Sequence, residues 1–208
     1  MNNEKIDLKK DYKILFTASA KDVTFIGIPA FNFLMIDGDG DPNSKKFQES
    51  VKSLYSVAYT IKNLCKRDSK LSDFTVSPLE GLWWSEKPEE FNIEKRDNWK
   101  WTLLIMLPEF VTSEIFEKAK TDVLNKKECD LADVVRFEYF DEGACAQIMH
   151  VGPYSTEQST VLKLSSTIKK AGYKLRGKHH EIYLGDPRKT APEKLRTILR
   201  QPIEKVEE

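Results

Sequence analysis

One acidic and one phenolic residue in this chain have the spacing of a ligand site. Glu181 and Tyr183 stand two positions apart in a run of strand-forming residues, so their side chains point to the same face of a strand. A carboxylate among aromatic rings is poorly solvated, which raises its pKa and makes it a base or the partner of a cationic ligand. On a wet sheet face, the same glutamate would pair with a nearby lysine or arginine. The pattern alone leaves both interpretations open.

Clustered aromatic residues are the second candidate for a site. Phe, Tyr and Trp make up 11% of the chain, Trp83 and Trp84 are adjacent, and Trp99 and Trp101 share one strand face. Any one of these rings is more typical of a hydrophobic core. As a set they predict a cleft that grips a flat heteroaromatic ligand. The rings that we assign to this cleft are Trp83, Trp84, Trp101, Tyr139, Phe140, Tyr154 and Tyr183.

Other kinds of site lack their residues. Asp37, Asp39 and Asp41 resemble the start of a calcium loop, but the Gly and the closing Glu that such a loop needs are missing. His179 and His180 point to opposite faces of a strand, unlike paired zinc ligands on a helix. The sequence has no GxSxG motif, no GxGxxG motif after a strand and no Walker lysine. We therefore expect no metal and no cofactor.

The composition excludes several classes of partner. The chain has 208 residues, with 33 Lys and Arg against 33 Asp and Glu, so its net charge does not attract nucleic acid or anionic membranes. The last fifty residues are basic, yet no DNA-reading unit can be placed there. No apolar run is long enough to span a membrane, and three isolated cysteines suit a reducing compartment. We expect a cytoplasmic protein that contacts neither nucleic acid nor membrane directly.

Hydrophobic periodicity and turn residues place these side chains on a series of elements. In the first half we expect a strand at 31–36, a helix at 44–65, strands at 74–84 and 99–106 joined by a polar loop with Pro88, and a connecting helix at 112–126. In the second half we expect strands at 134–140 and 144–150, a helix capped by Ser155 or Thr156, a strand at 178–184, a helical turn at 192–195 and a strand at 196–202. Residues 1–22 are polar and read as a frayed segment with one strand-like piece at 12–17.

The two halves of the chain follow the same plan. Gly40-Asp41-Pro42 matches Gly152-Pro153, and this register puts Trp83 at the place of Tyr183 and Gly81 at the place of Glu181. A shift by one residue would exchange Trp83 and Trp84. The predicted fold class is α+β: duplicated β-α-β-β units with two curved antiparallel sheets that enclose a central ligand cleft, and helices on the outside. One domain covers 22–208, with half 1 at about 23–108 and half 2 at about 134–204.

Several motifs together resemble the GyrI-like small-molecule-binding family over about residues 22–203. They are 37–43 (DGDGDPN), 80–84 (EGLWW), 150–154 (HVGPY) and 180–188 with the residues that follow it (HEIYLGDPR). The resemblance implies the fold of effector-binding domains in multidrug-sensing transcription regulators, in which a Glu equivalent to Glu181 lies at the base of an aromatic pocket for flat or cationic drugs. A stand-alone subset of the family looks like hydrolases of cyclopropanoid DNA-alkylating toxins, and the absence of a DNA-binding module here suits that subset.

The resemblance gives a lead function and two alternatives. The lead is a binder of planar xenobiotics that hydrolyses cyclopropanoid toxins, with Glu181 as the catalytic residue that activates water. The first alternative is a drug sponge or sensor without catalysis. The second is a protein that modulates a topoisomerase or transcription. The expected partners are planar aromatic or cationic small molecules, and the sequence leaves the oligomeric state open.

Overall fold

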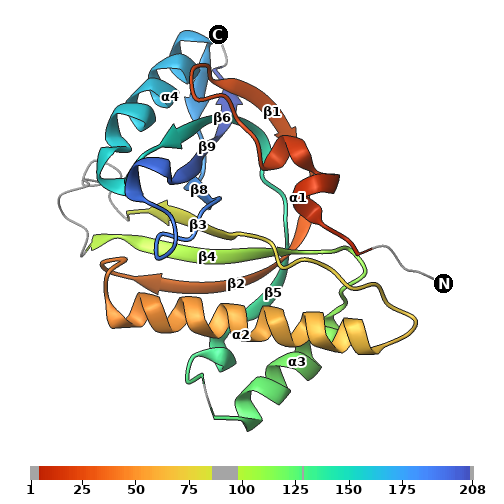
Figure 1. The fold of residues 1–208 in the computed structure, drawn as a ribbon. Helices are drawn as coiled ribbons and strands as arrows, with labels where there is room; N and C mark the ends of the chain where they lie inside the picture. Colours follow the sequence, from red (N-terminus) through yellow and green to blue (C-terminus); the bar gives the residue numbers. More distant parts are fainter. Residues whose placement is uncertain (1–4, 86–97, 128, 207–208) are drawn as a thin grey trace.

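A computed structural model describes residues 5–85, 98–127 and 129–206 of the chain, and the predicted loop with Pro88 lies outside them. Figure 1 labels the elements. The α-helices are α1 (Leu8–Asp11), α2 (Lys45–Arg67), α3 (Ser113–Asn125) and α4 (Gln158–Lys170), and the 3-10 turns are η1 (Lys13–Leu15), η4 (Ala132–Val134), η5 (Tyr154–Thr156) and η6 (Pro192–Lys194). The strands are β1 (Thr24–Ile28), β2 (Phe31–Asp39), β3 (Leu79–Trp84), β4 (Lys100–Leu107), β5 (Arg136–Phe140), β6 (Gly143–Val151), β7 (Tyr173–Leu175), β8 (His179–Tyr183) and β9 (Arg196–Lys205).

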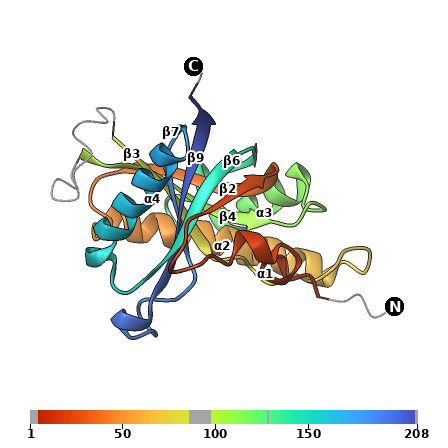
Figure 2. The ribbon, with the colours of Figure 1, turned by 90° about the horizontal axis from the view of Figure 1, so that it is seen from above.

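The nine strands of the described residues form one open antiparallel sheet. Its order is β1-β6-β9-β8-β3-β4-β2-β5, and the short strand β7 pairs with β9. Strand β9 crosses the molecule from side to side and carries the C-terminus away from the body (Figure 2). The predicted α+β class is confirmed. The predicted pair of sheets is instead a single sheet, because β3 and β8 pair directly at its centre.

The sheet has the internal repeat that the sequence predicted. The segment β2-α2-β3-β4 forms the strand order β2-β4-β3, and β6-α4-β8-β9 forms the equivalent order β6-β9-β8. Each half also gives an edge strand to the other, since β1 pairs with β6 and β5 pairs with β2. The two halves meet at β3 and β8, so residues at this seam come from equivalent positions of both halves.

Local sequence explains the main helices. Ser44 and Thr112 cap α2 and α3, because their hydroxyl groups accept hydrogen bonds from the backbone N–H groups of Phe47 and Ile115. The apolar stripe predicted for 44–65 packs Leu54, Val57, Ala58, Ile61 and Cys65 of α2 into the core. Ser155 and Thr156 do not cap α4: they belong to η5, and α4 begins one residue after Glu157.

Helices α2 and α4 cover the same face of the sheet, as strand alternation in the pairing register requires (Figure 1). Beneath α2 the core contains Leu34, Trp101 and Leu103, and beneath α4 it contains Ile148 and Leu199. Helix α3 packs beside α2. The central strands β3 and β8 therefore lie between the two helices.

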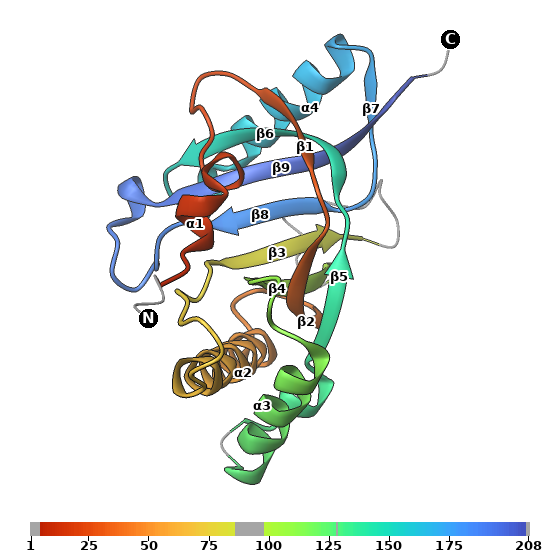
Figure 3. The same ribbon diagram turned by 90° about the vertical axis from the view of Figure 1, so that its right-hand side faces the viewer.

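The N-terminal segment covers the opposite face of the sheet (Figure 3). The prediction that it is frayed, with a strand at 12–17, is wrong: α1 and η1 form there, and Leu8, Leu15 and Phe16 are buried. These side chains pack on an apolar patch that the sheet would otherwise expose, which includes Leu82 and Ile182.

A buried ionic network fixes this segment to the central strands. His180 lies between two carboxylates, with Nε2 2.9 Å from Glu80 Oε2 and Nδ1 2.8 Å from Glu142 Oε1. Arg200 donates to Glu142 and to the backbone carbonyl of Leu15. The carboxylates raise the pKa of His180 to about 9 in spite of its burial, so His180 is a cation at neutral pH.

Candidate functional site

The seam between the two halves brings the predicted acid and one predicted tryptophan together. In the pairing of β3 with β8, Gly81 lies opposite Glu181 and Trp83 lies opposite His179. Side chains at 81, 83, 181 and 183 therefore share one face, which is the face that α2 and α4 cover. Glu181 is not in bulk solvent, since its side chain is 16% exposed.

Two hydrogen bonds connect Trp83 to Glu181 through Tyr183. The indole Nε1 of Trp83 donates to the Tyr183 hydroxyl over 3.0 Å, and that hydroxyl donates to Glu181 Oε2 over 2.8 Å. An indole N–H can only donate, so the tyrosine oxygen accepts there and its one proton points to Glu181. Glu181 Oε2 is therefore the acceptor. These two hydrogen bonds, the Trp83–Tyr183–Glu181 relay, hold Glu181 in one orientation.

Gly81 provides the space for this relay. A Cβ atom at position 81 would lie 2.8 Å from Trp83 Nε1 and 3.1 Å from the Tyr183 hydroxyl. Both distances are shorter than ordinary contacts between a carbon atom and a polar atom. Glycine is therefore the residue that lets the indole and the phenol meet directly above the strand.

Aromatic rings surround the relay on two sides. Phe47 of α2 stacks on Trp83 with ring centroids 5.9 Å apart, and Trp99 meets Trp83 edge to face at 5.5 Å. On the α4 side, Tyr154 meets Tyr183 edge to face at 5.8 Å. Trp83 is 4% exposed whereas Tyr154 is 38% exposed. Trp83 therefore forms the floor of the site, and Tyr154 faces solvent at its rim.

Two titratable groups at the relay, Tyr183 and His179, are neutral at pH 7. Burial and then Glu181 raise the pKa of Tyr183 well above its usual value, so this phenol keeps its proton and remains a donor. Burial lowers the pKa of His179 to about 4, with a further contribution from His180, so His179 is neutral at pH 7. Its Nε2 lies 3.7 Å from Glu181 Oε1, too far for a hydrogen bond. His179 therefore does not neutralise the carboxylate.

The structure places the remaining predicted site residues elsewhere. Trp84 points to the opposite face of β3, where Lys178 Nζ lies 3.4 Å from its ring centroid. Tyr139 is 75% exposed on the edge strand β5, and Phe140 packs against Phe33 on the opposite face of the sheet. Trp84 and Phe140 lie on the other face of their strands, and Tyr139 lies on an edge strand of the sheet. None of these three residues therefore lies beside Glu181.

Trp101 lies behind the floor of the site and not in its wall. It is fully buried, and its ring meets Phe47 edge to face at 5.1 Å. The ring fits only because Gly38 has no side chain, since a Cβ there would lie 2.0 Å from Trp101 Cη2. Trp101 supports Phe47, which in turn supports Trp83.

Sequence reasoning missed three residues of this group. Phe47 falls within the helix predicted at 44–65 but not within the predicted site, and Trp99 belongs to the aromatic cluster but was not assigned to the site. Glu157, which contributes to the raised pKa of Tyr183, follows Tyr154 by three residues, the spacing that puts two side chains on one side of a helical turn. That spacing was the available signal for Glu157.

Among residues 5–85, 98–127 and 129–206, no three His, Cys, Asp or Glu side chains gather in a way that could hold a metal ion. No helix in the same part of the chain has the length and apolar character to cross a membrane.

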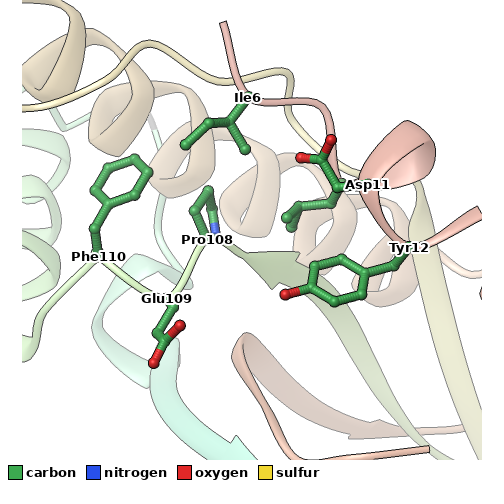
Figure 4. A pocket seen from close by; sticks show the side chains of 7 residues that line it. Ile6, Asp11, Tyr12, Pro108, Glu109 and Phe110 are labelled. Atoms are coloured by element: carbon green, nitrogen blue, oxygen red, sulfur yellow. The ribbon is translucent and has the colours of Figure 1, made fainter. Parts of the chain in front are cut away.

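A cavity of about 430 Å³ lies away from Glu181, between α1 and the turn after β4, where Tyr12 and Phe110 form part of its lining (Figure 4).

Comparisons with known proteins agree on the kind of domain. The sequence model of the GyrI-like small molecule binding domain matches residues 21–204. A crystal structure of an uncharacterized conserved protein from Listeria innocua is 45% identical, with 96% of this chain and 100% of that chain covered and a TM-score of 0.88. A hydrolase encoded by lin2189 from Listeria innocua is 42% identical, with 97% and 100% covered and a TM-score of 0.88.

More distant similarity concerns the fold alone. The C-terminal domain of EcmrR is 14% identical, with 89% of this chain and 98% of that chain covered and a TM-score of 0.59. No curated protein sequence matches the chain.

Proposed function

Because the chain belongs to the family of GyrI-like small molecule binding domains, we propose that it binds planar organic molecules between Trp83 and Tyr154. The observation that carries this proposal is the relay at the seam of the sheet, where a largely buried carboxylate lies among aromatic rings. Flat rings stack favourably on such walls, and the carboxylate adds a fixed charge to orient the ligand. Phe47 and Trp99 keep the floor rigid.

We further propose that the protein is a hydrolase of cyclopropanoid DNA-alkylating toxins. Support comes from the Listeria innocua hydrolase, which is 42% identical and is matched along its whole length. In this reaction a water oxygen forms a bond to the terminal cyclopropane carbon while the carbon–carbon bond of the ring breaks. The electron pair moves through the conjugated dienone to its oxygen. The product is the substrate plus one water, with a phenol in place of the dienone.

Glu181 is the base in this proposal. Its carboxylate accepts a proton from the attacking water, and the hydrogen bond from Tyr183 fixes its orientation. Water attacks well only when it is held near the carbon atom, which the surrounding rings achieve by fixing the planar substrate. The proton then leaves Glu181 and reaches the phenolate oxygen through solvent at the exposed rim.

The test is incubation of the purified protein with a cyclopropanoid DNA alkylator, followed by mass spectrometry of the small molecule. We expect the ring-opened hydrate to form with wild-type protein and to form much more slowly with Glu181→Gln. Glu117→Gln is the matched control, because Glu117 is an exposed residue of α3 outside the relay. A Glu181→Gln protein that forms hydrate at the wild-type rate would remove Glu181 from the mechanism.

Binding without chemistry is the second candidate, and the fold shared with the EcmrR C-terminal domain favours it. In that case the alkylator binds and quenches tryptophan fluorescence, but no hydrate forms above the background rate. A cytoplasmic location is part of both proposals. The three cysteines support it, since all are buried and free.

A further inference from the structure

A buried histidine lies at the centre of the turn that carries Tyr154. His150 is 5% exposed and lies near the end of β6, after which the chain passes through η5 into α4. Its Nε2 lies 3.2 Å from the Pro153 carbonyl oxygen and 3.3 Å from Thr156 Oγ1, and its Nδ1 lies 3.0 Å from Thr160 Oγ1. The imidazole therefore contacts polar groups before η5, within it and after it.

These partners determine how the imidazole of His150 is held. A carbonyl oxygen can only accept, so Nε2 carries a hydrogen and donates it to Pro153. The Thr156 hydroxyl donates to the same carbonyl over 2.8 Å. On the other side of the ring, the Thr160 hydroxyl can donate to Nδ1 or accept from it. The ring therefore keeps its partners in either protonation state.

The turn itself buries little surface. None of the three residues of η5 is buried. Gly152, which starts the turn, donates its backbone N–H to the Leu195 carbonyl over 3.0 Å and has a φ of 137°, which side chains rarely allow. A Cβ at Gly152 would also lie 3.4 Å from His150 Nε2. Because apolar packing does not fix the rest of the turn, its bonds to the buried imidazole decide where it lies.

The strand register places this histidine next to the proposed ligand site. Thr197 of β9 pairs with His150 of β6 and with Tyr183 of β8, so the three side chains share one face of the sheet. The ring of Tyr154 meets the Tyr183 end of this row, edge to face at 5.8 Å. A turn released from His150 would therefore move Tyr154 relative to Tyr183.

We propose that His150 is a positioning residue, which fixes Tyr154 as the rim of the ligand site before a ligand arrives. The inference rests on the proposed binding of planar molecules between Trp83 and Tyr154. His150 touches no ligand in this proposal, and it acts through the turn that it holds. A rim that is already fixed spares the ligand the loss of conformational entropy that ordering a mobile turn would require.

A double-mutant cycle tests whether His150 acts through Tyr154. Isothermal titration calorimetry measures the affinity of the planar dye 9-aminoacridine for wild type, His150→Leu, Tyr154→Ala and the double variant. His150→Gln is the conservative variant, because its side-chain amide can still donate to the Pro153 carbonyl. A thermal melt of each variant shows whether it is folded.

A milder pair of variants covers the case in which His150→Leu does not fold. Thr160→Val removes the hydroxyl beside Nδ1 and keeps the shape of the side chain, and it is also combined with Tyr154→Ala. Thr167→Val is the matched control, because the Thr167 hydroxyl lies in the same helix and donates to the Lys163 carbonyl.

We expect His150→Leu to weaken dye binding on the order of threefold to fivefold, the worth of one aromatic contact, and to have no further effect when residue 154 is alanine. His150→Gln should recover most of this loss. Thr160→Val should weaken binding roughly twofold, again only when Tyr154 is present, and Thr167→Val should leave it unchanged.

Two results would overturn the positioning role and leave the proposed binding intact. The first is equal weakening by His150→Leu, or by Thr160→Val, with and without Tyr154, since the histidine would then stabilise the fold in general. The second is wild-type affinity in folded His150→Leu. A wild-type protein that does not bind the dye would overturn both proposals.

Discussion

Replacing Gly81 by alanine tests the geometry of the relay most directly. The added Cβ would lie 2.8 Å from Trp83 Nε1, so the indole has to move by roughly half an ångström to reach an ordinary contact. Trp83 cannot yield easily, because it is 4% exposed and lies against Phe47 and Trp99. Overpacking of this kind destabilises a protein by about 1–3 kcal/mol. Alanine also lowers the conformational entropy of the unfolded chain, which stabilises the folded state by about 0.5–1 kcal/mol. We expect a net loss of about 1–2 kcal/mol in the free energy of unfolding.

Gly27→Ala is the matched control for this prediction. Gly27 also lies in a strand, β1, but a Cβ there would meet no atom within 4 Å. Urea unfolding of both variants should show destabilisation only for Gly81→Ala, and calorimetry should show weaker 9-aminoacridine binding only for that variant. If Gly81→Ala is as stable as Gly27→Ala and binds the dye like wild type, then Trp83 and Tyr183 do not meet above position 81.

Three further predictions concern the rings and the charges. Trp83→Phe removes the indole donor and should weaken 9-aminoacridine binding by roughly fivefold, the worth of one hydrogen bond, whereas Trp84→Phe on the opposite face should leave the calorimetric affinity unchanged. The pKa of His180 is raised from 6.5 to about 9, so its stabilisation is complete below pH 6.5 and is lost as the pH rises through about 9. Urea unfolding of wild type should show this decline, and a His180→Gln protein with the same decline would contradict it. The pKa of Tyr154 is raised to about 12, so a spectrophotometric titration should show no phenolate from Tyr154 at pH 10. A larger phenolate absorbance in wild type than in Tyr154→Phe at that pH would contradict the buried position of this phenol.

Much of the architecture could be predicted because it depends on local patterns. The helix expected at 44–65 is observed as Lys45–Arg67, since a stripe of apolar residues and a Ser44 cap define it without help from distant residues. The internal repeat was visible in the matched glycine-proline turns. The pairing register of the sheet agrees with it, because Gly81 lies opposite Glu181 where the halves meet.

The errors concern features that depend on contacts between distant segments. The N-terminal segment is polar on average, but Leu15 and Phe16 are buried and Arg200 bonds to the Leu15 carbonyl, a contact across most of the chain. The union of two predicted sheets into one depends on the pairing of β3 with β8, which no local pattern encodes. Tyr139 was assigned to the site by type, and only the position of β5 at the sheet edge shows that it is exposed.

The seam between the halves shows why a repeated unit forms a site with a single acid at its floor. Gly81 and Glu181 are opposite one another, and a second glutamate at position 81 would place two carboxylates on paired positions, where like charges repel. It would also displace the indole that supports Tyr183. On the other face the equivalent positions hold Glu80 and His180, whose charges attract. The two faces of the seam therefore differ. On one face, the ion pair of Glu80 and His180 holds β3 and β8 together. On the other face, the absence of a side chain at Gly81 leaves room for the relay.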